Sequence, residues 1–347
     1  MRYSQIAIAS LAMAIAFGGC SLAGRPPRAV VVLDEAFAAS RPSLAAHLQA
    51  AQTFGDGPAK LFSRALVVPL NLSEGAGKAI EAAREEKRRS GKSVILVTSP
   101  LVASAIIGGG SWSGEPPLLV PEYRGALQGK AISGLYTAVT DSVPAYQTAG
   151  RAAGLYIAEL AKAGSSPCCA VLFSESPSRP RTALAAFTAA FTTASGGRVP
   201  TVRELPGGNR TALGNTNAMP TTPESDAEAA VAELLGFDLR LLFIAIGPGS
   251  EAAISKASRP GLVVGLDSAA PMAPRGIAFR IRPDDKALAF ALEAERRTIG
   301  MTGDTARSVP ALLVAEAGAD SLSAGKLPFS QFLSNAALGA KGSDLSH

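Results

Sequence analysis

The stretch "CCAVLFSESPSRPRTALAAFTAAF", residues 168–191, decides the fold class. Its first six residues form a continuous apolar run, which is typical of a strand buried on both faces of a parallel sheet. From Arg181 onward the apolar residues recur at helical spacing, which predicts a helix. A buried strand followed directly by a helix is the repeating unit of α/β folds with parallel sheets.

The same unit recurs along the chain on both sides of this stretch. Apolar runs alternate with amphipathic segments, and the connections are rich in Gly, Pro and Ser. Right-handed crossovers between such strands give parallel sheets, and two series of units predict two Rossmann-like lobes. Strands are predicted at 28–37, 64–71, 92–99, 116–123, 133–142, 168–176, 198–205, 239–247, 260–268, 275–282 and 308–318, and helices at 41–54, 73–91, 100–110, 143–164, 179–197, 226–237, 248–258 and 283–300.

Composition excludes several functional classes. The formal charge is +5 over 347 residues, and no Lys/Arg cluster is interleaved with aromatic residues, so a nucleic-acid partner is not expected. The two histidines exclude a His-rich metal site, and no cofactor motif is complete. Aromatic residues are 5% against 47% hydrophobic in total, which predicts cores of Ala, Val, Leu and Ile. The adjacent Cys168 and Cys169 are either small core residues or, less simply, a redox pair.

The amino terminus has the pattern of an export signal. One basic residue, an apolar run from Ile6 to Phe17 and two glycines precede Cys20, and the run is too short to span a bilayer. The segment "AFGGC" resembles the lipobox of bacterial lipoproteins. The resemblance implies cleavage before Cys20, thioether lipidation and acylation with fatty acids such as palmitate, and thus anchoring in the bacterial cell envelope. The alternative is an ordinary signal peptide that is cut elsewhere.

Three stretches carry a resemblance to a known fold family. They are "TDSVPAYQTAGRAAGLYIAEL" (140–160), "AVLFSESPSRPRTALAAFTAAF" (170–191) and "LLFIAIGPGSEAAISKA" with the later "GLVVGLDS" (241–268). Their order is similar to that in type 1 periplasmic binding proteins, which include ribose-type sugar receptors and nucleoside receptors of the basic-membrane-protein class. The resemblance implies two lobes, a hinge of several crossovers and a cleft between the lobes.

This resemblance, combined with the predicted elements, gives a domain organisation. The signal peptide is expected at 1–19, followed by the lipidated cysteine and a linker at 20–28. The first lobe is expected to comprise 29–141 plus 268–301, and the second 142–267 plus 302–330. Residues 331–347 are expected to be a flexible tail.

Candidate ligand-binding residues follow from the predicted strand ends. In open α/β sheets ligands bind beyond the carboxyl ends of the strands, and in a two-lobed protein those ends line one cleft. The candidates are Asp34, Glu35, Phe37, Asn71, Ser73, Thr98, Ser99, Tyr123 and Asp141 from the first lobe, and Glu175, Arg179, Ser250 and Asp267 from the second.

Each candidate has a structural alternative. Asp34 and Glu35 could simply end a strand, and Asp141 and Asp267 could cap helices or bond hinge backbone. Trp112, the only tryptophan, either stacks on a ligand or packs on the edge of a lobe. Sugar receptors of this type combine arginines with acids, whereas here the only arginines near predicted strand ends are Arg179 and, as alternatives, Arg280 or Arg282. This scarcity argues against a sugar ligand.

The leading functional hypothesis is a lipid-anchored substrate-binding protein. It would capture a nucleoside- or sugar-type ligand in the cleft and present it to the permease of an ABC-type importer, facing the periplasm from the inner or outer membrane. The alternative is an envelope lipoprotein of the same fold that binds another protein. An enzyme ranks third, because neighbouring carboxylates such as Asp34 and Glu35 on a strand point to opposite faces.

Overall fold

A computed structural model describes eleven segments of the chain. Within them, no helix combines the length and the apolar character needed to cross a bilayer. The expected signal peptide and Cys20 lie outside the described residues. These are 28–50, 62–68, 72–110, 112–123, 132–176, 178–205, 224–236, 238–247, 250–269, 274–299 and 306–343.

The first lobe is built on a six-stranded parallel sheet with the order β11-β5-β4-β3-β1-β2. The apolar run of β1 is buried on both faces, as the sequence predicts. Helices α4 and α5 cover one face, and α3 and α10 cover the other. The elements are β1 Arg28–Asp34, α2 Glu35–Ser40, α3 Pro42–Ala50, β2 Phe62–Val68, α4 Leu72–Ser90, β3 Val94–Thr98, α5 Pro100–Gly108, β4 Leu118–Pro121, β5 Leu135–Asp141, α10 Asp285–Thr298 and β11 Ala306–Pro310.

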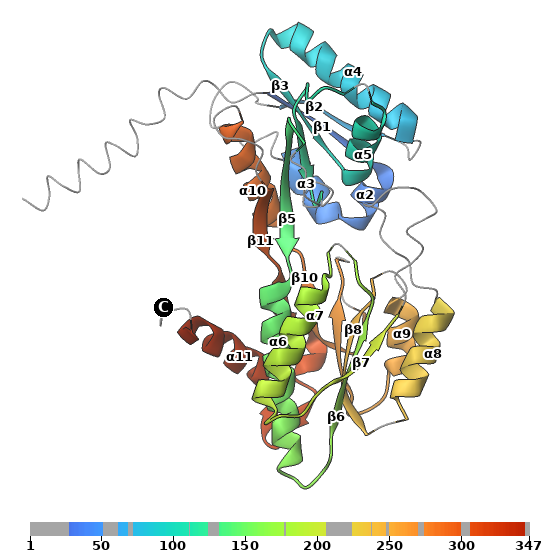
Figure 1. The fold of residues 1–347 in the computed structure, drawn as a ribbon, viewed down its shortest axis with the longest axis vertical. Helices are drawn as coiled ribbons and strands as arrows, with labels where there is room; N and C mark the ends of the chain where they lie inside the picture. The colour runs from blue at the N-terminus through green and yellow to red at the C-terminus, as the bar shows by residue number, and fades with distance from the viewer. Residues whose placement is uncertain are drawn as a thin grey trace, which may run out of the picture.

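The second lobe repeats this architecture with the order β12-β10-β9-β8-β6-β7, in which β12 alone is antiparallel to its neighbour. Figure 1 shows the two lobes stacked along the long axis of the molecule, with β5 and β11 running between them. The elements are α6 Val143–Ala161, β6 Cys168–Phe173, α7 Arg181–Ala194, β7 Thr201–Glu204, α8 Glu224–Leu234, β8 Leu239–Ala245, α9 Ser250–Ala257, β9 Val263–Asp267, β10 Ile277–Arg282, β12 Leu312–Ala315, the 3-10 helix η2 Ala317–Ala319, β13 Ser323–Ala324, β14 Leu327–Pro328 and α11 Phe329–Ser343.

Aromatic residues are concentrated in the core of the second lobe. Phe243 stacks on Phe187 and Phe279, with ring centroids 5.2 and 5.6 Å apart, and Phe279 stacks in turn on Phe329 of α11. The expectation of cores made only of Ala, Val, Leu and Ile is therefore wrong for this lobe. The chain has few aromatic residues, but several of them lie in contact with one another in this core, beneath α6, α7 and α11.

Helices α6 and α7 approach each other unusually closely. A Cβ atom at Gly150 would lie 2.2 Å from the carbonyl oxygen of Phe187, and one at Gly154 would lie 2.6 Å from that of Phe191. Only glycine fits at these two positions, one helical turn apart on one face of α6. The backbones themselves thus form the contact between the two helices.

The chain crosses between the lobes three times, and two crossings differ from the sequence expectation. Strand β10 lies in the second sheet and β11 in the first, so the crossings follow Arg282 and Pro310 rather than residues 267 and 301. The single strand predicted at 308–318 is in fact β11 and β12, which belong to different sheets and are separated only by Ala311. The sequence does not reveal this crossing, because the two strands follow each other within one largely apolar stretch.

The carboxyl-terminal segment also differs from the expectation of a flexible tail at 331–347. Helix α11 extends to Ser343, and Phe332, Leu333 and Ala336 are buried against the second lobe. The apolar spacing of these residues is that of an amphipathic helix, which explains why the segment docks. Residues 344–347 lie outside the described residues.

Candidate functional site

The carboxyl ends of the strands in the two sheets face each other. Strand β5 ends at Asp141 and leads into α6 of the second lobe, while β10 ends at Arg282 and leads into α10 of the first. Strands parallel to β5 or to β10 therefore end at the same junction between the lobes (Figure 1). This is the edge at which open α/β sheets bind ligands.

In the first lobe, Asp34 and Ser99 are engaged with each other. Asp34 is fully buried and caps α2, since its Oδ1 accepts a 2.8 Å hydrogen bond from the backbone N–H of Phe37. Its Oδ2 accepts a hydrogen bond from the Ser99 hydroxyl. Both carboxylate oxygens are thus used within the lobe, and the structural alternative holds for this aspartate. Glu35 is exposed whereas Asp34 is fully buried, so the two acids lie in different surroundings.

The remaining candidates of the first lobe have different surroundings. Phe37 is half-buried in the first turn of α2, while Tyr123 is buried in the core beneath α4 and α5. Thr98 is fully buried at the end of β3, and its hydroxyl has no hydrogen-bond partner in the described part of the chain. Asn71 lies outside the described residues, and the structure does not describe the side chain of Ser73.

Asp141 is a hinge residue. Its Oδ1 accepts a 3.0 Å hydrogen bond from the N–H of Val143 at the start of α6. Its backbone carbonyl accepts a 2.8 Å hydrogen bond from the N–H of Ala311 at the third crossing. Two of the three crossings are therefore bonded directly to each other at this residue.

Arg179 is the most distinctive candidate of the second lobe. It is only 4% exposed, and its Nε donates a 3.2 Å hydrogen bond to the carbonyl of Ser174 at the end of β6. Its Nη atoms lie so close to Gly247 that a Cβ there would be 2.6 Å from Nη2. Among the described residues, neither Nη atom of this buried side chain has a hydrogen-bond partner.

Asp267 lies at the end of β9 and is paired with a residue that the sequence analysis missed. Its Oδ2 accepts a 2.6 Å hydrogen bond from the hydroxyl of Tyr146 in α6. Burial raises the pKa of Asp267 above its ordinary value, while the charge of Arg179 and the Tyr146 hydroxyl act in the opposite direction. Burial and the charge of Asp267 also raise the pKa of Tyr146, so this hydroxyl remains protonated.

Ser250 and Glu175 have local structural roles. Ser250 begins α9, and its hydroxyl donates a 2.5 Å hydrogen bond to the carbonyl of Gly247. Glu175 forms an ion pair with Arg181, which also binds Glu204. Ser250 therefore shapes the turn beside Arg179, and Glu175 belongs to an exposed network.

Unsatisfied buried polar atoms mark the same edge. In the described segments three buried side-chain atoms lack a hydrogen-bond partner: Thr98 Oγ1, Ser174 Oγ and Arg282 Nε. They lie at the carboxyl ends of β3, β6 and β10, respectively. Burying such groups without partners costs free energy, and native proteins tolerate few of them. Both lobes thus present unused polar groups at the edges that face each other.

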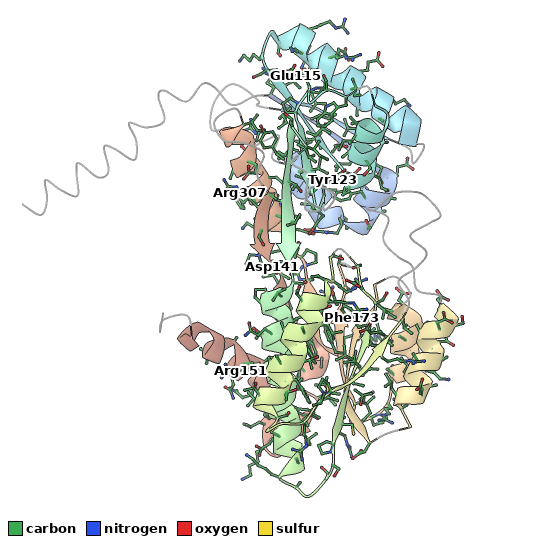
Figure 2. All side chains as sticks on the ribbon, in the orientation of Figure 1. Glu115, Tyr123, Asp141, Arg151, Phe173 and Arg307 are labelled. Carbon is green, nitrogen blue, oxygen red and sulfur yellow. The ribbon has the colours of Figure 1, made fainter. Side chains whose placement is uncertain are left out.

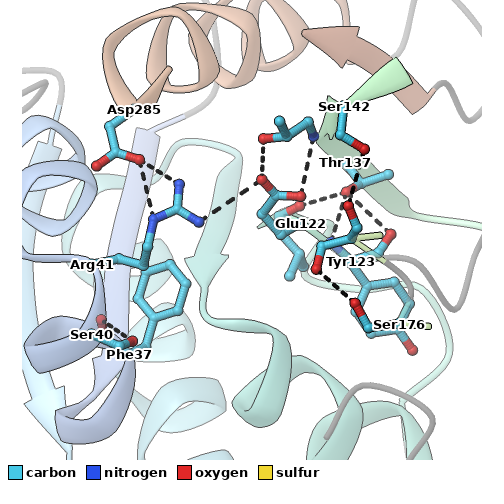
Figure 3. Close-up of polar contacts among 12 residues, drawn as sticks. Phe37, Ser40, Arg41, Glu122, Tyr123, Thr137, Ser142, Ser176 and Asp285 are labelled. Atoms are coloured by element: carbon cyan, nitrogen blue, oxygen red, sulfur yellow. Dashed lines mark hydrogen bonds and ion pairs between the residues drawn. The ribbon is translucent and has the colours of Figure 1, made fainter. Parts of the chain in front are cut away.

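The first lobe also contains a polar network that sequence reasoning missed (Figure 3). Arg41 donates to Asp285 at the start of α10, with 3.1 Å between Nε and Oδ1, and its Nη1 lies 3.9 Å from Oε1 of Glu122. Glu122 has a φ of 57°, and its Oε2 accepts a 3.1 Å hydrogen bond from the N–H of Thr140. The network joins the helix that follows the second crossing to β4 and β5.

Two other sequence candidates lie away from this edge. Trp112 packs on the first lobe, and its Nε1 donates a 3.0 Å hydrogen bond to the carbonyl of Pro116, so it does not stack on a ligand at the junction. Cys169 is buried in the second core, which raises the pKa of its thiol, and it forms no disulfide with the neighbouring Cys168. The described residues contain no cluster of His, Cys, Asp and Glu that could hold a metal ion.

Comparisons with known proteins identify the fold. No family model and no curated protein sequence matches the chain. An ABC-transporter solute-binding protein from Aeropyrum pernix K1 is 13% identical, with a TM-score of 0.51, over 91% of this chain and 86% of that one. A periplasmic ribose ABC transporter from Conexibacter woesei DSM 14684 is also 13% identical, with a TM-score of 0.51, over 84% of this chain and 92% of that one.

A regulator has the same fold. Transcription regulator CcpA of Lactococcus lactis is 9% identical, with a TM-score of 0.51, over 83% of this chain and 98% of that one. At these identities the likeness establishes architecture alone. The chain has the two-lobed α/β fold of type 1 periplasmic binding proteins, as its sequence predicts.

Proposed function

We propose that this protein is a lipid-anchored substrate-binding protein that captures a small polar ligand between its lobes for an ABC-type importer. The type 1 periplasmic-binding-protein fold is the starting point, since its two lobes can close on a ligand by hinge motion. The proposed anchor is a diacylglycerol on Cys20, in the cell envelope and facing the periplasm. Enzymatic activity and nucleic-acid binding are not part of the proposal.

One observation carries the binding function. Neither Nη atom of the buried Arg179 guanidinium is hydrogen-bonded to a described residue, and this side chain lies at the carboxyl edge of the second sheet, near the Tyr146–Asp267 pair. Asp267 uses one oxygen for Tyr146, and its other oxygen accepts no hydrogen bond from any described residue. A polyol would satisfy both groups, because its hydroxyls can donate to the carboxylate and accept from the guanidinium.

The first lobe would contribute less to the ligand. Among the described residues of this lobe, the Thr98 hydroxyl is the buried side-chain group without a hydrogen-bond partner, and Phe37 offers a half-buried ring. An aromatic plate beside a few hydrogen-bonding groups suits the apolar face of a sugar or a nucleobase. Sugars and nucleosides are therefore the ligand classes of choice, and ribose, named for one structure of this fold, is a natural first probe.

The hydrogen bonds and packing of the first lobe also favour a second function, the binding of another protein. Asp34 and Ser99 bond each other, and Tyr123 is part of the core, so these expected contacts are not available to a small ligand. A protein that binds another envelope protein would not need them. This alternative predicts that no small molecule stabilises the chain.

Thermal unfolding of the full chain tests the proposal. Pentoses, hexoses, nucleosides and amino acids are added one at a time at 1 mM, after unfolding and refolding to remove any co-purified ligand. A ligand at 100 times its Kd stabilises the native state by about 2.7 kcal/mol, which raises Tm by several degrees. Absence of any shift would overturn the proposal and favour the protein-binding alternative.

Matched variants connect any ligand to the site. Arg179→Gln removes the guanidinium proposed to bind the ligand, and it should abolish the shift. Arg181→Gln removes a neighbouring exposed guanidinium that is ion-paired with Glu175 and Glu204, and it should retain the shift. Thr98→Val keeps shape and removes one unsatisfied hydroxyl, so it should weaken binding without loss of stability. A ligand whose shift survives Arg179→Gln and Thr98→Val binds elsewhere.

A further inference from the structure

The end of the first lobe that lies farthest from the second lobe carries exposed positive charge. Helix α4 ends there at Ser90, and β1 and β3 begin there, with the N–H of Arg28 bonded to the carbonyl of Ser93. Figures 1 and 2 show the end of α4 and the labelled Glu115 at this pole of the molecule. We call the exposed bases of this region the basic pole: Arg84, Lys87, Arg88, Arg89 and Lys92.

Ion pairs account for only part of this charge. Arg89 and Arg28 both bind Glu86, and Lys87 lies 3.5 Å from Glu115. Arg84, Arg88 and Lys92 are exposed and have no ion-pair partner within the described segments. Cations in the last turn of a helix gain from its dipole, but that effect covers neither Arg84, more than a turn earlier, nor Lys92 beyond the helix end. Arg84 and Arg88, four residues apart, also repel each other.

The chain leaves the first lobe at this pole. The first described residue, Arg28, is eight residues beyond Cys20, and eight extended residues span at most about 28 Å. A protein held by Cys20 therefore keeps this end of the first lobe near the bilayer. There the unpaired bases gain from anionic headgroups, within the roughly 8 Å over which salt permits such attraction at physiological ionic strength.

We propose that the basic pole docks on the anionic phospholipid surface of the membrane that holds the anchor. This inference rests on the proposed lipid anchor at Cys20, and it adds an orientation to it. The amino-end edge of the first sheet faces the headgroups, the two carboxyl edges lie one lobe away from them, and the second lobe is farthest out. The junction between the lobes is then open to the side rather than to the bilayer.

Trp112 provides a native probe of this arrangement. It is the only tryptophan of the chain, and it lies just before Glu115, which is ion-paired to Lys87 of the basic pole. The full chain is reconstituted into phosphatidylcholine vesicles with or without 30% phosphatidylglycerol, each containing a lipid with a nitroxide on its headgroup. Flotation of the vesicles reports anchoring, and quenching of Trp112 reports which face meets the headgroups.

We expect Trp112 quenching that requires phosphatidylglycerol and is lost at 0.5 M salt. The triple variant Arg84→Gln/Arg88→Gln/Lys92→Gln should weaken this docking by about tenfold or more, since each base near an anionic surface contributes severalfold. The control Arg151→Gln/Lys256→Gln/Lys326→Gln removes three exposed bases of the second lobe, and it should quench like the wild type.

The outcomes separate this inference from the proposed function. A chain that floats with its vesicles but shows equal Trp112 quenching with and without phosphatidylglycerol would keep the anchor and overturn the docking. A chain that neither floats nor shows quenching would overturn both the anchor and the docking. Equal loss of quenching in the two triple variants would indicate a general charge effect and would also overturn the assignment. Ligand binding is measured separately by thermal unfolding and is independent of all three results.

Discussion

The hydroxyl of Ser99 donates a hydrogen bond to the carboxylate of Asp34 across 65 positions of sequence. The bond joins the ends of β1 and β3, both at the carboxyl edge of the first sheet. It turns two groups expected to contact a ligand into a structural pair. This hydrogen bond links the two strand ends at the edge of the first lobe that would meet a ligand.

Removing the Ser99 hydroxyl should therefore destabilise the protein. Ser99→Ala leaves a buried carboxylate oxygen without its donor, which we expect to lower the free energy of unfolding by about 1–3 kcal/mol. Ser40→Ala removes an exposed hydroxyl bonded to the carbonyl of Phe37, and its effect should stay within about 0.5 kcal/mol. Urea unfolding measures both. An unchanged stability in Ser99→Ala, with loss of ligand binding, would instead make the pair a ligand contact.

The raised pKa of Asp267 makes stability depend on pH. A carboxyl group whose pKa is higher in the folded than in the unfolded protein contributes stability below the unfolded pKa, near 3.9, and loses that contribution as pH rises through the folded pKa. Asp267→Asn removes this dependence. From pH 4 towards pH 7 the variant should therefore gain stability relative to the wild type.

Urea unfolding at intervals of half a pH unit provides the measurement for Asp267→Asn. Asp238→Asn is the control, because Asp238 is exposed and ion-paired with Arg240. Parallel pH curves for Asp267→Asn and the wild type would show that Asp267 titrates as an ordinary carboxyl group.

The close approach of α6 and α7 should not tolerate a methyl group. Gly150→Ala places Cβ 2.2 Å from the Phe187 carbonyl, and we expect a loss of about 2 kcal/mol or more, since the backbones must separate. Gly77→Ala is the matched control in α4, where a Cβ meets no atom within 4 Å, and it should stabilise by up to about 1 kcal/mol. Thermal unfolding of both variants decides the matter. A stabilised Gly150→Ala would contradict the packing described for these helices.

Helix α11 should contribute to global stability. Phe329 is fully buried and contacts Phe279 and Tyr156, so Phe329→Ala should cost about 3–5 kcal/mol. Leu338, on the same helix, is 69% exposed, and Leu338→Ala should change stability by less than about 0.5 kcal/mol. If both variants unfold like the wild type, the helix does not dock in solution.

The alternation of strands and helices was predictable because burial imposes it locally. The runs at β1, β6 and β8 are apolar on both faces, and each is followed by amphipathic residues, so fold class and lobe number follow from periodicity alone. The crossing at Ala311 was not predictable in this way. Strands β11 and β12 have the same local character, and only their partners, β5 and β10, distinguish them.

The sequence predicted where the candidate site residues lie better than it predicted what each of them does. Asp267 lies at the end of β9 and Arg179 in the connection from β6 to α7, and in the described part of the chain Asp267 Oδ1 and the Arg179 Nη atoms have no hydrogen-bond partner. Asp34 has the same sequence signature, yet its partner Ser99 is remote in sequence and no local pattern indicates the bond. Tyr146 was missed for a similar reason, because a tyrosine within an apolar helix predicts a core residue and its bond to Asp267 joins positions 121 apart.

The three crossings have a consequence for the order in which the protein can fold. A chain that emerges from its amino end has delivered all of β1 to β5 by residue 141, but the edge strand β11 of that sheet arrives only with residues 306–310. The second sheet likewise waits for β12. Residues 306–315 close both sheets, so neither lobe can be completed before almost all of the other has been synthesised. Long-range closure of this kind slows folding, and it leaves a growing chain without a finished sheet in either lobe until residues 306–315 have been made.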